Sequence, residues 1–270
     1  MVRNRMTLGG VIVSLCALSC GKEQPALERA PVASATLEAP AAQQGAAPFA
    51  VDTASSSFRF EMDSPLEKID GEAPQSLKGE LFVDPADLSK STALLRADLL
   101  KLTLYQQKRA DEKGEYGERK KSDLQNEHAR DWLQIRAKEG EVTAEQAEQN
   151  RWAELKIDKL TDLSAADVTK LSGAERKITA TAHGELRLHG RKAAKSAKIE
   201  LSFRYAGDKL ESLAVTTREP FVITLEEFEV HPRDAAGKLV KKLSDALASN
   251  LRGKVAADAP VEVSFVAQPR

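Results

Sequence analysis

The sequence predicts a mainly β fold of antiparallel strands, either a sandwich or a barrel. Many short runs alternate apolar with polar residues, a pattern that encloses one face of a strand and leaves the other in water. Gly, Asp and Pro stand between these runs, as they do between strands joined by tight turns. Two segments break the alternation and favour helix instead. We therefore expect one β domain carrying helical insertions.

The alternating runs share apolar side chains at every second position. They lie at 58–62, 93–99, 184–188, 199–203, 221–225 and 261–265. We expect each run to form a strand with its apolar side chains on the enclosed face.

The first segment without alternation covers about 106–150 and is crowded with Glu, Lys, Arg and Gln. Ser122 is placed to cap a helix, and Thr143 to cap a second one. The apolar or aromatic positions expected on the first helix are Leu124, His128, Trp132 and Ile135, spaced near 3.6 residues.

The second such segment predicts a helix over about 234–252. Its apolar residues, which mark one helical face, are Leu239, Val240, Leu243, Leu247 and Leu251. Gly253 is a plausible end for this helix.

The N-terminus has the layout of a secretory signal over residues 1–19. Arg3 and Arg5 precede an apolar stretch from Leu8 to Leu18, which is shorter than the roughly 20 residues that a spanning helix needs. Cys20 follows this stretch and resembles the lipid-bearing cysteine of bacterial lipoproteins. The alternative is an ordinary signal cleaved near Ser19, which would release a protein that carries no lipid.

Residues 20–48 are rich in Ala, Pro and Gln and show no apolar periodicity, so we expect a disordered linker after a lipidated Cys20. The other cysteine, Cys16, lies within the signal. An exported domain over 49–270 then has no cysteine, which excludes an internal disulfide and thiol catalysis.

Charge and motif content narrow the function classes. The 40 basic and 41 acidic residues give a net charge of −1, which argues against a dedicated nucleic-acid binder. The chain contains neither a Gly-x-Ser-x-Gly nor a His-Glu-x-x-His run, and we assign no catalytic residue.

Several segments together resemble the YceI-like family of exported lipid-binding proteins. They are Phe49–Asp52 followed by Ser55–Phe60, then Gly79–Asp84, Asn126–Leu133, and Ala182–Lys192 with its two glycines. The resemblance runs from about Phe49 to Ala267 and implies a lipocalin-like antiparallel barrel with an apolar interior. Some members of that family hold a long isoprenoid chain. The helical region after Gln106 is longer than a typical member's loop.

With such a barrel, the enclosed face of the strands would line a ligand site. The residues expected there are Phe58, Phe60, Leu95, Leu99, Leu186, Leu188, Phe203, Phe221 and Ile223. A barrel of about eight strands can either fill its interior with side chains or hold one small ligand. Apolar inward residues fit both cases, so the alternation leaves the choice open.

Three sets of polar residues have possible functional interpretations, but for each set we favour an ordinary structural one. His183 and His189 share a strand face with Glu185 and Arg187, but residues six apart on a strand lie about 20 Å apart, too far to share a metal. We expect a solvated outer face and no metal site. Asp131 beside Trp132 is expected in water. The basic residues Arg187, Arg191, Lys192, Lys195 and Lys198 are expected to be ordinary outward charge, although such a cluster could attract anionic headgroups.

The sequence thus predicts a non-enzymatic envelope lipoprotein. We expect it to bind a long-chain isoprenoid or other lipid in the barrel, with no other cofactor, and to face the periplasm from the outer membrane. A secreted or periplasmic form is expected if Cys20 carries no lipid. The alternative function is an interaction lipoprotein with a filled barrel, whose charged helices dock an unknown protein partner.

Overall fold

The computed structural model describes residues 32–33, 36–231 and 256–270. The predicted signal, Cys20 and the helix expected over 234–252 lie outside these residues. The strands are β1 (Val32–Ala33), β2 (Ala47–Asp63), β3 (Glu67–Pro74), β4 (Leu77–Val83), β5 (Thr92–Asp98), β6 (Thr103–Lys108), β7 (Lys120–Lys121), β8 (Trp152–Thr161), β9 (Glu175–Leu188), β10 (Arg191–Ala206), β11 (Lys209–Thr217), β12 (Phe221–Thr224) and β13 (Asp258–Pro269). The helices are α1 (Asp123–Trp132) and α2 (Ala144–Asn150), with short 3₁₀ turns η1 (Leu88–Lys90), η2 (Leu99–Lys101), η3 (Val168–Lys170) and η4 (Leu225–Phe228).

The mainly β prediction is confirmed, and the sheet closes into a barrel. Eight strands form an antiparallel ring in the order β2, β4, β5, β8, β9, β10, β11 and β13, and β13 pairs back with β2. Closure leaves none of these strands with a free edge along its full length. Each alternating run predicted from the sequence falls in a strand, except that Leu99 opens η2 and Leu225 opens η4.

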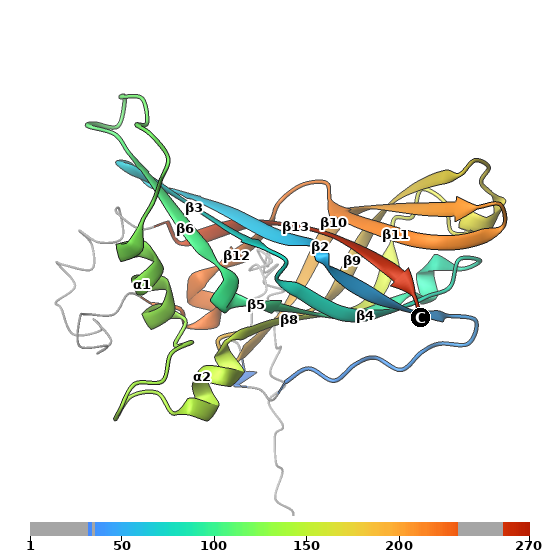
Figure 1. Cartoon of the computed structure of the whole chain (residues 1–270), viewed down its shortest axis with the longest axis horizontal. Helices are drawn as coiled ribbons and strands as arrows, with labels where there is room; N and C mark the ends of the chain where they lie inside the picture. The colour runs from blue at the N-terminus through green and yellow to red at the C-terminus, as the bar shows by residue number, and fades with distance from the viewer. Residues whose placement is uncertain (1–31, 34–35, 232–255) are drawn as a thin grey trace, which may run out of the picture. The chain divides into compact units, whose positions relative to one another are not determined.

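The sheet extends beyond the ring at one end. On the edge where its first residues pair with β4, the 17-residue β2 pairs with β3 over its last residues, which in part still pair with β13 on the other edge. Strands β6 and β7 continue outward from β3. β12 pairs with the first residues of β13 at the same end, and α1 lies against β6 there (Figure 1). We call this the α1 end.

The opposite end is filled by packed side chains and loops. Phe49, Phe203 and Leu213 are each at most 2% exposed there. η1 and η3 join across this end, because the Leu88 amide donates to the Ala166 carbonyl at 2.9 Å. The hollow part of the barrel must therefore lie toward the α1 end.

Two glycines of the Ala182–Lys192 segment have distinct physical roles. A Cβ on Gly184 would lie 1.8 Å from the Lys156 carbonyl oxygen, so only glycine allows β8 and β9 to approach there. Gly190 and His189 both have positive φ and form the two-residue turn between β9 and β10, a type I′ geometry. His189 therefore lies in a turn. The expectation that it shares a strand face with His183 is wrong.

Both helix caps in the insertion form as expected. The Ser122 hydroxyl accepts the Gln125 amide at the start of α1, and Thr143 and Gln146 form a reciprocal capping box at α2. The first helix is shorter than its apolar spacing indicated, since it ends at Trp132 and Ile135 lies beyond it. Ile135 is nevertheless buried in the core.

We expected a disordered linker over 20–48, but the residues of this stretch that the structure describes contact the barrel. β1 pairs with the start of β10, and Leu37 is 3% exposed against the outer wall of the barrel. The Leu37 amide donates to Glu154 on β8 at 2.8 Å. The hydrogen bond to the buried Glu154 carboxylate fixes this segment on the barrel. The composition of residues 20–48 gives no sign of this contact.

No helix within the described residues has the length and apolar character required to cross a membrane.

Candidate lipid-binding cavity

A cavity of about 400 Å³ occupies the barrel interior toward the α1 end. Its wall is almost entirely apolar and comes from ring strands, from β3, β6 and β12, and from α1. Eight of the nine residues predicted for the ligand site line it, namely Phe58, Phe60, Leu95, Leu99, Leu186, Leu188, Phe221 and Ile223. The structure thus brings together side chains from widely separated parts of the chain, and their role in binding stays a prediction.

Phe203 is the exception among these nine residues. It is fully buried and lines a second, smaller cavity of about 80 Å³ nearer the filled end. Leu95, Leu155 and Val263 line both cavities, so the smaller one continues the larger one into the barrel. Phe203 faces inward as the alternation indicated, but it lies too deep to line the larger cavity.

The barrel is therefore hollow at one end and packed at the other. Small-molecule sites in proteins have volumes of roughly 300–1,000 Å³ and mostly apolar walls. The larger cavity falls within that range. Of the two interiors that the sequence left open, the structure has the hollow one near α1.

Helix α1 supplies one wall of the cavity. The residues that face inward are Gln125, His128, Ala129 and Trp132, which recur at the spacing of one helical face. The His128 and Trp132 rings are stacked, with centroids 5.6 Å apart and planes 9° apart. Trp132 is thus docked on the barrel as expected, but as part of the cavity wall.

Asn126 fixes α1 against the barrel. This side chain is 7% exposed, and its Oδ1 accepts the Leu104 amide while its Nδ2 donates to the Leu104 carbonyl, each at 3.0 Å. One amide side chain therefore pairs both peptide groups of a β6 residue, as a neighbouring strand would. This anchor determines which face of α1 meets the cavity.

The outer wall carries a buried charge cluster that contradicts one expectation. Arg187 was expected on a solvated face, yet its side chain is 1% exposed, with an Nη1 3.8 Å from Oε2 of the equally buried Glu154. Arg96 donates to the other Glu154 oxygen at 2.8 Å. Burial lowers the pKa of the Arg187 guanidinium, and the Glu154 carboxylate opposes that shift.

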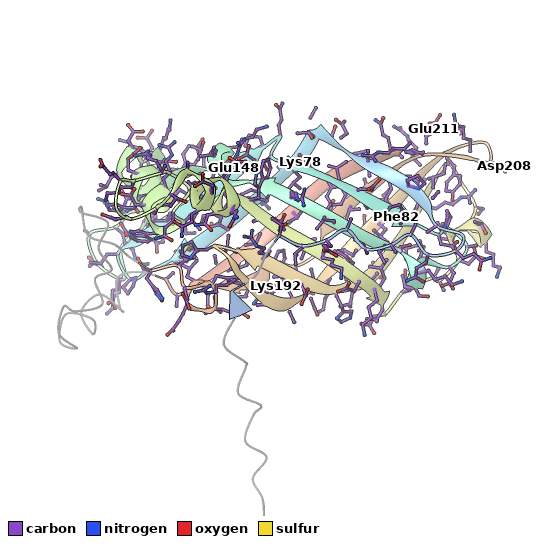
Figure 2. All side chains as sticks on the ribbon, turned by 90° about the horizontal axis from the view of Figure 1, so that it is seen from below. Lys78, Phe82, Glu148, Lys192, Asp208 and Glu211 are labelled. Carbon is purple, nitrogen blue, oxygen red and sulfur yellow. The ribbon has the colours of Figure 1, made fainter. Side chains whose placement is uncertain are left out.

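The other four basic residues of the predicted cluster each have a carboxylate partner. Arg191 pairs with Glu229, Lys195 with Glu227, and Lys198 with Glu219, and Lys192 lies 3.8 Å from Glu185. Figure 2 labels Lys192 on the outside of the barrel, and it labels Glu148 and Asp208 at opposite ends. Because these cations are matched, the cluster offers no excess of positive charge to an anionic headgroup.

His183 and His189 have structural hydrogen-bond partners. His183 lies between Thr161 and Ser196 at 2.7 and 2.8 Å, and His189 lies between the Phe228 carbonyl and Gln134. Within the described ranges no group of His, Cys, Asp or Glu is arranged to hold a metal ion.

Sequence reasoning missed part of the cavity wall. Leu102 and Leu104 line the cavity, but they follow the η2 turn and do not continue the period of the β5 run. The charged residues after Gln106 also favoured a helical interpretation of this segment. Leu77 and Val230 also line it. Their runs are short, and only the closed strand order shows that they face the same space.

Comparisons with known proteins find likeness in structure only. No family model matches the sequence, and no curated protein matches it. One similar solved structure is a polyisoprenoid binding domain from Saccharophagus degradans implicated in plant cell wall breakdown, with 15% identity, 82% of this chain and 98% of that chain covered, and a TM-score of 0.49. Another is BcnA of Burkholderia cenocepacia, with 14% identity, 80% and 98% covered, and a TM-score of 0.43. The closed barrel of the present chain is established by its own strand pairing.

Proposed function

We propose that this protein is a YceI-like binding protein that holds one amphiphilic isoprenoid-type lipid in its barrel. The observation that carries the proposal is the apolar cavity of about 400 Å³ at the α1 end. The resemblance of the Ala182–Lys192 segment to the YceI-like family supports the same ligand class.

The mechanism is sequestration by burial of apolar area. Each methylene removed from water contributes about 0.8 kcal/mol, so ten of them contribute about 8 kcal/mol before the costs of ordering the lipid. A wall of aliphatic and aromatic side chains supplies this without any reactive group. The proposal therefore includes no covalent step and no enzyme activity.

The proposed setting is the bacterial cell envelope. A lipid on Cys20 would anchor the protein in the outer membrane on its periplasmic side, close to a source of the ligand. The support for this setting is the signal layout of residues 1–19 and the single cysteine that follows it.

The proposal is tested by replacing a small lining residue with a large one that occupies part of the cavity. Ala97 lines the cavity, so Ala97→Phe places a ring where ligand carbons would lie. Loss of only two buried methylenes removes about 1.6 kcal/mol, so we expect phytol, a branched isoprenoid alcohol, to bind at least about tenfold more weakly. The measurement is transfer of radiolabelled phytol from phosphatidylcholine vesicles to the protein.

The matched control adds the same ring outside the cavity. Ala206 is exposed at the end of β10, and Ala206→Phe should leave phytol transfer unchanged. Equal transfer to both variants and to the original protein would show that the lipid does not occupy the barrel.

A further inference from the structure

The polar side chains of the cavity wall gather at one end. Among the described lining residues the polar or charged ones are Ser64, Glu67, Gln125 and His128, from the start of the β2–β3 connection to β3 and from α1. The deeper wall toward Phe203 is mostly aliphatic and aromatic, and its polar members are the uncharged Ser91, Thr92 and Thr217. The cavity therefore has a polar end and an apolar end, which fits a ligand that has both.

Two of these four side chains already have partners. The Ser64 hydroxyl donates to the Glu67 carbonyl at 2.8 Å, and the Glu67 carboxylate accepts the Gln106 amide. By contrast, the side-chain amide of Gln125 and the imidazole of His128 hydrogen-bond to no other residue in the described part of the chain, whereas the backbone amide of Gln125 donates to Ser122. Half-buried polar groups of this kind gain from a partner that a ligand supplies.

The two unpaired groups are held in place and leave room between them. They are three residues apart on the cavity face of α1, and the small side chain of Ala129 lies beside them on that face. Stacking on Trp132 orients the His128 ring, and the Asn126 anchor fixes the helix. A ligand group entering here meets a donor and acceptor pair that is already positioned.

The charge at this end selects the kind of polar group. None of the described lining residues is Lys or Arg, whereas Glu67 brings a carboxylate to the same end. A phosphate or carboxylate would lose its water without a cation to replace it and would lie near a like charge. A neutral hydroxyl or carbonyl oxygen avoids both costs and can hydrogen-bond to the amide and the imidazole.

We propose that Gln125 and His128 form the polar subsite of the cavity and that it receives a neutral hydroxyl or carbonyl group of the isoprenoid ligand. The inference rests on the proposed function, and it adds which end of the lipid lies at α1 and which headgroup class is rejected. The apolar chain then extends from α1 toward Phe203.

Three probes with one branched skeleton test the headgroup class on the full protein. Phytol carries a hydroxyl, phytanic acid carries a carboxylate, and phytane carries neither. At pH 8 we expect phytol to transfer from phosphatidylcholine vesicles with about tenfold higher affinity than phytanic acid. Equal or tighter binding of phytanic acid would overturn the inference without any variant being made.

Two variants test the subsite residues. His128→Phe and Gln125→Leu keep size while removing hydrogen bonding, and each should weaken phytol binding about fivefold and leave phytane binding unchanged. His231→Phe and Gln268→Leu make the same exchanges at described residues outside the cavity wall and should change neither.

The outcomes separate the inference from the proposed function. If phytol and phytane bind equally to the variants and to the original protein, the polar subsite is wrong while lipid binding stands. If none of the three probes transfers to the original protein, both fail.

Discussion

At the scale of single residues, Glu154 is the buried carboxylate whose charge the fold must stabilise. It is 1% exposed, and its two oxygens accept the Arg96 guanidinium and the Leu37 amide beside the buried Arg187. A buried carboxylate is tolerated only when hydrogen bonds and opposite charge replace its water. Here they come from three separate parts of the chain, so this one residue ties the N-terminal segment to the barrel wall.

Glu154→Gln should therefore destabilise the fold strongly. It removes the carboxylate charge beside buried Arg187, and breaking a buried ion pair costs about 3–5 kcal/mol. Glu262→Gln is the matched control, because its pair with Arg59 is largely in water and is worth less than about 1 kcal/mol. The measurement is the free energy of unfolding in urea, and equal losses in the two variants would show that the wall cluster is not buried in solution.

At the scale of elements, α1 is the part of the molecule that turns a barrel into a candidate binding site. The helix forms one wall of the cavity, and its position depends on the two hydrogen bonds between Asn126 and Leu104. Its cavity face combines apolar contact with the side chains of Gln125 and His128, which have no hydrogen-bond partner among the residues that the structure describes. A helix placed this way can determine which headgroup fits without altering the strands.

Asn126→Ala should loosen this helix and leave the barrel closed. Loss of the side chain leaves the buried Leu104 amide without that partner, at a cost of about 1–3 kcal/mol. We expect faster hydrogen exchange confined to α1 and β6, together with weaker phytol binding. Glu127→Ala, at an exposed position one residue further along the same helix, serves as the control. Exchange that accelerates throughout the ring would contradict a local anchor.

At the scale of the whole molecule, the sequence predicts which segments form strands and which side chains face inward. It does not predict how deep in the barrel each inward side chain lies. Alternation tells which side of a strand is enclosed, so it placed Phe58, Phe60, Leu186 and Leu188 inside. It carries no information on depth, and Phe203 accordingly lies beside the smaller cavity.

Contacts between distant segments were also beyond the sequence pattern. Arg187 has the outward parity of a solvated residue, but it is buried beside Glu154, whose oxygen accepts the amide of Leu37, 117 residues away in the chain. The sequence also did not predict that Gln125 and His128 face the cavity. Periodicity alone does not say which face of a helix meets the barrel, and here the hydrogen bonds of Asn126 determine it.

The most direct measurement of the central claim is native mass spectrometry of the protein purified without detergent, followed by organic extraction of the same sample. A hollow barrel that sequesters an isoprenoid-type lipid predicts a population with the mass of one chain plus one ligand, and a neutral isoprenoid in the extract. A spectrum of the bare chain alone, with an extract that contains no isoprenoid, would contradict the account.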